Sequence, residues 1–396
     1  MKNIYTLILG LATFYMAGAQ CANNRYKDQI FSTVTKTTVL YSSAYNLSMD
    51  IYTPDTDTEI NRPVILLAHG GSFTGGARTE TTLVELCTRF AKRGYVTASM
   101  SYRLAGSAFD MLSESTAYPV VVKAISDGKA AVRYLKANSA TLGIDSNRVI
   151  VGGNSAGAIL MLHLAYIDDL NEANTNTIIY NALVANGGFE GNSGNDGPTS
   201  KVFVMVDWAG GIQDTTWMSS GNVPVVNLHG DPDGTVPYGC GQVLNGISQV
   251  SVCGPGVYNT RLDNVGISHV SKRYPGLDHQ PWGSAGTGAV FNECDSITRD
   301  FLYSYICENA ASVKPVNNDI LAVYPNPATE TVNINLANAN AYTSVQLLDY
   351  TGRVVAEQAI NGSLVSIARA QHSAGMYFVR LIKNDNTTAL KKVIFE

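Results

Sequence analysis

Residues 149–157 read VIVGGNSAG, an apolar run that enters a Gly-Asn-Ser-Ala-Gly turn. Apolar residues with helical spacing follow at once: Ala158, Ile159, Leu160, Leu162 and Leu164. Between a strand and a helix, a G-x-S-x-G motif puts its serine on a sharp turn with the hydroxyl over the sheet edge. The glycines two residues before and after Ser155 are needed where strand and helix pass too close for a Cβ. The segment therefore predicts a strand, a strained turn at Ser155 and a helix.

Strand and helix patterns alternate on both sides of this segment. Residues 26–55 alternate polar and apolar side chains, which predicts an antiparallel strand pair at a sheet edge. A continuous apolar run predicts a strand buried on both faces at 64–68. Further short strands are expected at 95–100, 148–151, 202–206, 223–228 and 268–274. Helices are expected at 81–93, 120–138 and 292–308, besides the one after Ser155. The alternation predicts an α/β domain with a doubly wound, mostly parallel sheet.

The pattern changes near residue 309. Residues 309–318 are small and polar with one proline, as in a linker. Short alternating strands separated by turn residues follow, which predicts a small all-β sandwich over 319–396.

The N-terminus resembles a signal peptide. Lys2 precedes an apolar run, Ile4 to Met16, and Ala17-Gly18-Ala19 forms a small-residue cleavage site. The run is shorter than the roughly 20 residues of a membrane helix, so residues 1–19 are expected to be removed. Lipidation of Cys21 is disfavoured because Gln20 precedes it. We therefore expect a protein that is secreted or held on the outer cell surface, with a catalytic domain at 20–308 and no stable membrane insertion.

Composition limits the possible partners and cofactors. The 396 residues are 15% charged with a net charge of −5 and contain no basic run, so nucleic acid is not expected to bind. Six cysteines in an exported chain favour disulfides. Short loops favour Cys240–Cys253 and Cys294–Cys307, although spacing does not fix the pairing. A structural zinc site is not expected, because the sequence has no C-x-x-C motif and no cluster of Cys and His residues. The nucleophile, base and acid described below need neither a metal nor an organic cofactor.

A second motif, His69-Gly70-Gly71-Ser72-Phe73, follows the buried strand 64–68. Glycines at a strand end let backbone amides face a cleft, where they can hold a developing oxyanion. We expect the amide of Gly71, with Gly70 and Ser72 as alternatives, to act together with the amide of Ala156. His69 is expected to shape the loop.

A serine nucleophile needs a base, and the base needs a carboxylate. His279 lies on a loop after the last strand and is the expected base. The other histidines fit other places: His163 a core helix, His229 a strand end that supports the next loop, His269 a strand, and His372 the C-terminal sandwich.

Asp233 is the expected acid, in the segment His229-Gly-Asp-Pro-Asp233. Asp231 is the second choice, Asp207 is weaker, and Asp278 is too close to His279 in sequence. The expected substrate contacts are Phe73, Asn154, Trp208 and Trp282, although core packing explains the aromatic residues equally well.

These motifs carry a family resemblance. The region from Asn46 to Glu308 resembles an α/β-hydrolase of the esterase/lipase type and is most similar to secreted carboxylesterases and feruloyl-esterase-like enzymes. The resemblance implies an acid at Asp233, and it departs from many relatives at Ser72, where they have a third glycine. It implies a serine carboxylic-ester hydrolase that acts on polysaccharide-linked acyl or feruloyl esters. The alternatives are a serine peptidase of the same fold and a surface-binding protein without activity.

The C-terminal region resembles the sorting domain of the type IX secretion route. The matching pieces are Val323 to Pro327, Leu348 to Val355, Ser373 to Tyr377 and the pair Lys391-Lys392. The resemblance implies the type IX secretion machinery as a partner. A carbohydrate-binding sandwich is the alternative, but no aromatic row lies on one strand face.

Overall fold

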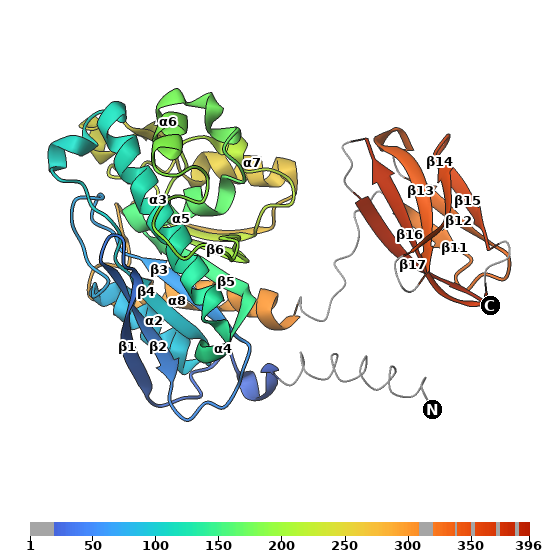
Figure 1. Cartoon of the computed structure of the whole chain (residues 1–396), viewed down its shortest axis with the longest axis horizontal. Coiled ribbons are helices and arrows are strands. Elements are labelled where there is room, and N and C mark those ends of the chain that lie inside the picture. The colour runs from blue at the N-terminus through green and yellow to red at the C-terminus, as the bar shows by residue number, and fades with distance from the viewer. Residues whose placement is uncertain (1–19, 309–319, 337–338, 350–352, 370–372, 385–387) are drawn as a thin grey trace. The chain divides into compact units, whose positions relative to one another are not determined.

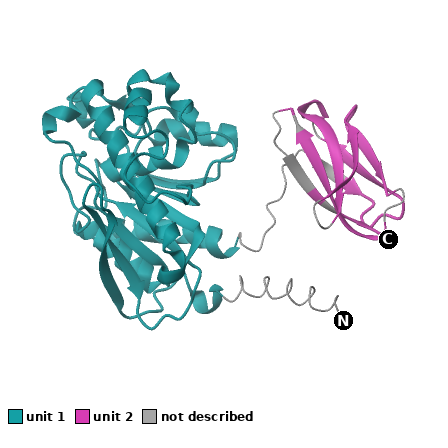
Figure 2. Cartoon of the chain, in the orientation of Figure 1, with its two compact units in different colours: residues 1–308 teal, residues 309–396 magenta. Residues whose placement is uncertain are grey.

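The structure, a computed structural model, describes residues 20–308, 320–336, 339–349, 353–369, 373–384 and 388–396 (Figure 1). The chain divides into two compact units, Met1–Glu308 and Asn309–Glu396 (Figure 2). The expected signal peptide (1–19) and linker (309–318) lie outside the described residues.

The first unit is built on an eight-stranded sheet in the order β1-β2-β4-β3-β5-β6-β7-β10. The strands are β1 (Val34–Ser42), β2 (Leu47–Pro54), β3 (Arg62–Ala68), β4 (Val96–Met100), β5 (Ile144–Asn154), β6 (Val204–Trp208), β7 (Val225–Gly230) and β10 (His269–Tyr274). The pairs β1–β2 and β2–β4 are antiparallel, and the pairs from β4 to β10 are parallel. This confirms the mostly parallel α/β sheet with an antiparallel edge.

Helices cover both faces of this sheet. They are α2 (Thr81–Lys92), α3 (Glu114–Ala137), α4 (Ser139–Leu142), α5 (Ala156–Tyr166), α6 (Thr177–Ala185), α7 (Pro255–Val265) and α8 (Ala289–Tyr303). Alternate residues of β3 enter two separate cores. Leu66 packs with side chains of α3 and α5, whereas Leu67 packs with side chains of α2 and α8. The run 64–68 is continuously apolar because the strand is buried on both faces.

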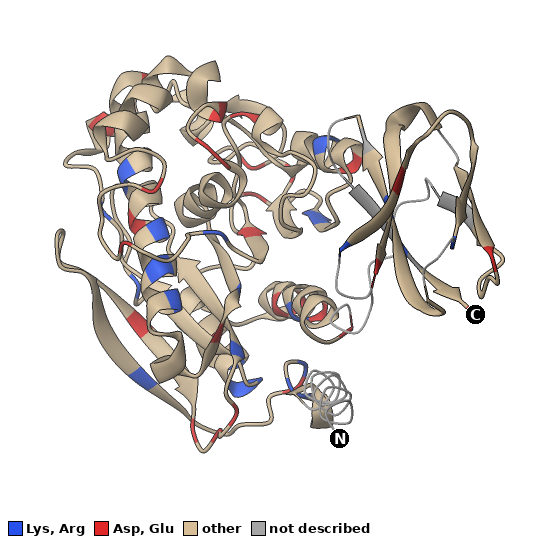
Figure 3. Ribbon diagram, turned by 45° about the vertical axis from the view of Figure 1, so that its right-hand side comes forward, with Lys and Arg blue, Asp and Glu red and all other residues tan. Residues whose placement is uncertain are grey.

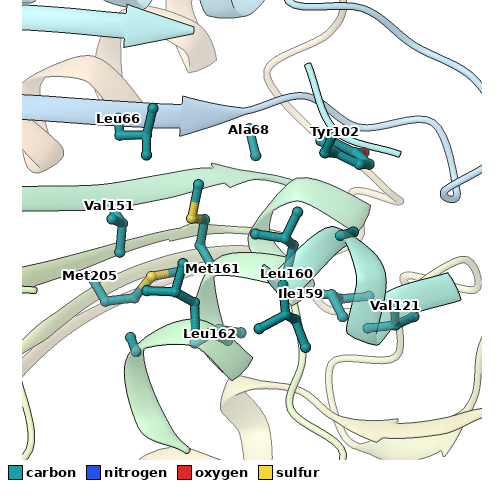
Figure 4. Close-up of a cluster of buried hydrophobic side chains, with 14 of the residues drawn as sticks. Leu66, Ala68, Tyr102, Val121, Val151, Ile159, Leu160, Met161, Leu162 and Met205 are labelled. Atoms are coloured by element: carbon teal, nitrogen blue, oxygen red, sulfur yellow. The ribbon is translucent and has the colours of Figure 1, made fainter. Parts of the chain in front are cut away.

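The helix after Ser155 is buried along its whole length. Every residue of α5 is buried, so the helix is apolar all round. Figure 4 shows Met161 of α5 on the side of Val151 of β5, and Ile159 of α5 on the side of Val121 of α3. This packing fixes the position of the turn from which α5 starts.

Two predicted helices have different boundaries: the helix expected at 292–308 is α8, Ala289–Tyr303, and α3 starts earlier than expected. Helix α3 begins at Glu114, before the predicted start at Val120, and Pro119 lies inside it. A proline lacks the backbone N–H that an interior helical residue donates. In the sequence, Pro119 therefore indicates the start of a helix and not its interior. The flanking residues Tyr118 and Val121 are buried in the core, and this packing carries the helix through the proline.

The cysteine pairing confirms one predicted disulfide and corrects the other. Cys240 pairs with Cys253 across β8 (Cys240–Gln242) and β9 (Ser251–Cys253). The predicted Cys294–Cys307 bond is wrong, because Cys307 pairs with Cys21 and Cys294 is a buried free thiol. Cys294 lies within α8, and 13 helical residues span about 20 Å, far beyond the roughly 6 Å between disulfide Cα atoms.

The second unit has two antiparallel sheets, β11-β12-β15 and β14-β13-β16-β17. Their strands are β11 (Ile320–Tyr324), β12 (Thr331–Leu336), β13 (Tyr342–Asp349), β14 (Val354–Ala359), β15 (Leu364–Ala368), β16 (Gly375–Lys383) and β17 (Thr388–Phe395). Alternate residues of β12, Val332, Ile334 and Leu336, share one core with Val345 and Val379 of the other sheet. This confirms the predicted small β-sandwich.

Charged side chains are spread through the described parts of both units, with a series of basic residues along α3 (Figure 3). No helix in the described part of the chain is long and apolar enough to cross a membrane.

Candidate active site

Ser155 lies on a strained turn between β5 and α5. Its φ of 51° and ψ of −122° are unfavourable for a residue with a side chain. The flanking glycines show why the turn needs them. A Cβ on Gly153 would lie 2.5 Å from the Ala68 carbonyl oxygen, and one on Gly157 would lie 2.1 Å from the same atom. Backbone therefore touches backbone at this turn, as the motif predicts.

Three distant side chains form a continuous hydrogen-bonded series. The Ser155 hydroxyl lies 2.9 Å from His279 Nε2, and His279 Nδ1 lies 2.7 Å from Asp233 Oδ2. His279 belongs to the loop after β10, and Asp233 to the loop after β7. Both strands are parallel to β5, so their carboxyl ends bring these loops to the same edge of the sheet.

Asp233 is held by four donors. Its Oδ1 accepts from the amides of Thr235 and Val236, and its Oδ2 from His279 and from His229 Nε2 at 3.1 Å. Burial acts against the carboxylate charge, but the hydrogen bonds from His229 and His279 hold the pKa of Asp233 well below its usual range. Asp233 therefore remains charged beside His279.

The other candidate acids are engaged elsewhere. Asp231 accepts from Arg273 at 2.6 Å, and Asp207 is buried against the Tyr258 hydroxyl and the Gly210 amide. Asp278 accepts the backbone amide of its neighbour His279.

The remaining histidines lie away from the Ser155 hydroxyl. His163 is buried on α5 and contacts the Ile159 carbonyl, and burial lowers its pKa to about 4. His69 contacts the Gly70 carbonyl at 2.7 Å and stacks on Tyr102, within the loop it is expected to shape. His229 supports the next loop through the Val236 carbonyl, and His269 lies in β10. His372 lies outside the described residues.

The loop after β3 offers free backbone amides next to Ser155. The Gly70 amide donates to Glu80 Oε2 at 3.3 Å, so it is occupied. Within the described part of the chain, the amides of Gly71, Ser72 and Ala156 have no hydrogen-bond acceptor. Gly71 has a φ of 111°, where a Cβ would lie 2.4 Å from the Gly75 carbonyl oxygen. The turn brings this loop back on itself and therefore requires glycine.

Glu80 joins the loop after β3 to the turn that carries Ser155, and it was not predicted from the sequence. Its carboxylate accepts from the Gly70 amide and, at 2.8 Å, from Asn154 Nδ2. It links the loop after β3 to the residue before Ser155. Glu80 immediately precedes α2, and nothing in the sequence pattern marks a partner 74 residues away.

Two cavities meet at Ser155. The first, here called the apolar lobe, is lined mostly by hydrophobic side chains: Ser72, Phe73, Met111, Val121, Ser155, Ala156, Ile159, Thr235, Val236, Val243, Leu244, Val250 and Val252. The second, here called the open lobe, is polar: Gly70, Gly71, Ser72, Gly76, Glu80, Ser155, Thr235, His279 and Gln280. Only the open lobe includes His279.

The predicted substrate contacts divide into two groups. Phe73 lines the apolar lobe. Trp208 and Trp282 do not line either lobe; they pack on each other, 4.8 Å between ring centroids, in the core beneath α8, and Trp208 donates to Thr298. Asn154 is buried and directed to Glu80, so the structure does not place it in contact with a substrate.

Comparison with known proteins identifies both units. Residues 49–221 match the BD-FAE family, and residues 322–396 match the secretion system C-terminal sorting domain. The chain carries an esterase-like α/β-hydrolase domain followed by a C-terminal sorting domain. The sorting domain indicates secretion and attachment at the cell surface, as expected.

Several curated relatives of the hydrolase domain are esterases. The chain is 28% identical over 142 residues to gut esterase 1 of Caenorhabditis elegans, covering 36% of this chain and 25% of that protein. It is 29% identical over 135 residues to carboxylesterase NlhH of Mycobacterium tuberculosis, covering 34% of this chain and 38% of that protein. The chain thus spans only a quarter to two fifths of these relatives.

The fold is shared with a solved esterase. The propionate-bound esterase Est2 of Thermogutta terrifontis aligns with a TM-score of 0.53 at 18% identity, covering 68% of this chain and 94% of that one. At this identity the likeness confirms the fold of the hydrolase domain.

Proposed function

We propose that the protein is a secreted serine carboxylic-ester hydrolase that acts through Ser155, His279 and Asp233. The observation that carries the proposal is the series of contacts from Ser155 Oγ to His279 Nε2 and from His279 Nδ1 to Asp233 Oδ2. Esterase relatives of the hydrolase domain support the same reaction class.

In this mechanism His279 takes the Ser155 proton as the hydroxyl attacks the ester carbonyl carbon. Asp233 holds the imidazole in the tautomer with the proton on Nδ1. The carbonyl oxygen becomes an oxyanion, for which the free amides of Gly71 and Ala156 are the proposed donors. His279 then protonates the leaving alcohol, and water releases the acid from the acyl-enzyme by the same steps in reverse.

The two lobes divide the substrate between them. His279 must reach the leaving oxygen, and it lines only the open lobe, so the alcohol is assigned there. The acyl group is then assigned to the apolar lobe, where Phe73 and Ile159 provide apolar walls. We propose acyl or feruloyl groups carried on a polysaccharide as the substrate class, and the apolar walls support the acyl or feruloyl part of this proposal.

We also propose that the C-terminal sorting domain delivers the hydrolase domain to the type IX secretion machinery. Its match over 322–396 supports this partner.

A panel of p-nitrophenyl acyl esters and feruloyl esters tests the proposal on wild type and Ser155→Ala. We expect wild type to hydrolyse these esters and to react covalently with an organophosphonate at Ser155. The variant should lose both, with kcat falling at least about 10³-fold. Cleavage of proline-containing peptides without ester turnover indicates a peptidase, and the absence of turnover and labelling indicates a surface-binding protein.

A further inference from the structure

We infer that Glu80 makes the alcohol side of this site selective for charge, so that esters of neutral or cationic alcohols react faster than esters of anionic alcohols. The inference rests on the proposed esterase function and on the assignment of the alcohol to the open lobe.

Glu80 is the only acidic or basic residue besides His279 among the described residues that line the open lobe. Its carboxylate oxygens accept from the Gly70 amide and from Asn154, which is adjacent to Ser155. Both partners are neutral donors, so they hold the carboxylate in place without cancelling its charge.

Nearby cations are committed to other carboxylates. Arg78, two residues before Glu80, donates to Asp50 at 3.0 Å, and Arg273 pairs with Asp231. None of the ion pairs found among the described residues includes Glu80. His69 faces the same loop, but burial lowers its pKa and keeps it neutral. The open lobe therefore presents one negative charge that the protein leaves unpaired.

This charge acts on the alcohol and not on the acyl group. The described residues that line the apolar lobe include no acidic or basic side chain, so its contribution depends on shape and burial. Each carboxylate oxygen of Glu80 has one protein donor and retains acceptor capacity for an N–H or O–H of the substrate. An anionic alcohol brings two like charges within several ångströms, whereas a cationic one gains an attraction.

Three butyrate esters of similar size test this inference: those of choline (cationic), 3,3-dimethylbutanol (neutral) and 4-hydroxybutanoate (anionic). Released butyrate is quantified by chromatography at low ionic strength. For wild type we expect kcat/KM for the neutral ester to exceed that for the anionic ester by about tenfold, with the cationic ester at least as fast as the neutral one. At about 1 M salt, where the screening length is about 3 Å, the preference should shrink.

Glu80→Gln should bring the neutral-to-anionic ratio close to one, whatever its effect on the absolute rate. Glu85→Gln is the matched control, because Glu85 lies within α2, the helix that begins directly after Glu80, pairs with Arg89 and lines neither lobe. It should keep the wild-type ratio. If Glu80→Gln does not fold, the wild-type ratio and its salt dependence still decide.

Equal kcat/KM for all three esters in wild type overturns the inference, as does a ratio that Glu80→Gln retains. In either case esters are still hydrolysed and the proposed function survives. If wild type hydrolyses none of the three and the organophosphonate does not label Ser155, the proposed function fails and the inference fails with it.

Discussion

Ser155 and His279 meet at 2.9 Å, yet the segments that carry them are held in different ways. The Ser155 turn is fixed by contact, because Gly153 and Gly157 leave no space for one further carbon atom beside the Ala68 carbonyl. The loop that carries His279, in contrast, has free space around it. Pro275 to Asp278 are exposed, and a Cβ on Gly276 or Gly283 would meet nothing within 4 Å.

The loop is instead positioned by hydrogen bonds that involve charge. His279 is bonded to Asp233, and Asp233 to His229 and two backbone amides. The loop approaches the sheet closely at Gly230, where a Cβ would lie 2.1 Å from the Leu277 carbonyl oxygen. Apart from this one contact at Gly230, volume governs the side of the site that carries Ser155, here called the nucleophile side, and charge governs the side that carries Asp233 and His279, here called the acid–base side. Each of the following changes acts on one side.

The largest effect is expected for Asp233→Asn. An amide cannot hold His279 in the required tautomer, and an uncharged group does not stabilise the imidazolium, so kcat should fall about 10⁴-fold, or about 5.5 kcal/mol. Ester hydrolysis under substrate saturation measures this. Asp231→Asn is the matched control, because Asp231 pairs with Arg273 at the surface, and its kcat should stay within about twofold of wild type. Equal losses in the two variants contradict the assignment of Asp233.

The next largest effect is expected for Gly157→Ala, on stability. The added Cβ would lie 2.1 Å from the Ala68 oxygen and 2.5 Å from the Ala68 carbonyl carbon, so β3 and α5 must move apart. We expect the free energy of unfolding to fall by about 4 kcal/mol, at the upper end for single substitutions. Urea denaturation followed by circular dichroism measures this.

Gly276→Ala is the control in the loop that carries His279. Its φ of 72° disfavours alanine, but the added Cβ meets no neighbour, so the loss should be about 1 kcal/mol. If Gly276→Ala lowers the free energy of unfolding as much as Gly157→Ala does, the His279 loop is packed as tightly as the Ser155 turn, and the proposed difference is wrong.

Features fixed by local sterics were predictable from the sequence. The G-x-S-x-G motif encodes the Ser155 turn, and the run 64–68 encodes a strand buried on both faces. Ser155, Asp233 and His279 each follow a predicted strand, and this pattern, together with the family resemblance, was sufficient to expect them at one sheet edge. Contacts between distant segments were not encoded in this way. Glu80 meets Asn154 only after folding, and Cys21 meets Cys307 across 286 residues.

The two tryptophans show the same limit. Trp208 and Trp282 follow strand or motif residues, which is consistent with a pocket wall, but they are buried with Phe291 of α8. A pattern of apolar residues indicates burial and does not say whether a ligand or a helix provides the contact. That choice depends on how α8 packs, and local periodicity carries no information about it.

The smallest expected effect is on the pH dependence of stability. It tests again whether charge holds the side of the site that carries Asp233 and His279. The pKa of Asp233 is lower in the folded protein than in the unfolded chain, so the unfolded chain binds a proton first as the pH falls. The stability that Asp233 contributes is complete above about pH 4 and is lost progressively as the pH falls toward the folded pKa. Wild type should therefore lose about 1 kcal/mol more than Asp233→Asn between pH 6 and pH 3.

Chemical denaturation of both proteins at pH 6, 5, 4 and 3 measures the difference, which cancels the titration of other carboxylates. The difference between wild type and Gly276→Ala provides the reference. Backbone strain carries no proton, so that difference should stay constant over the same range. If the wild type and Asp233→Asn curves run parallel, charge does not hold the acid–base side. The His279 loop would then be positioned by its packing at Gly230, as the Ser155 turn is positioned by its glycines.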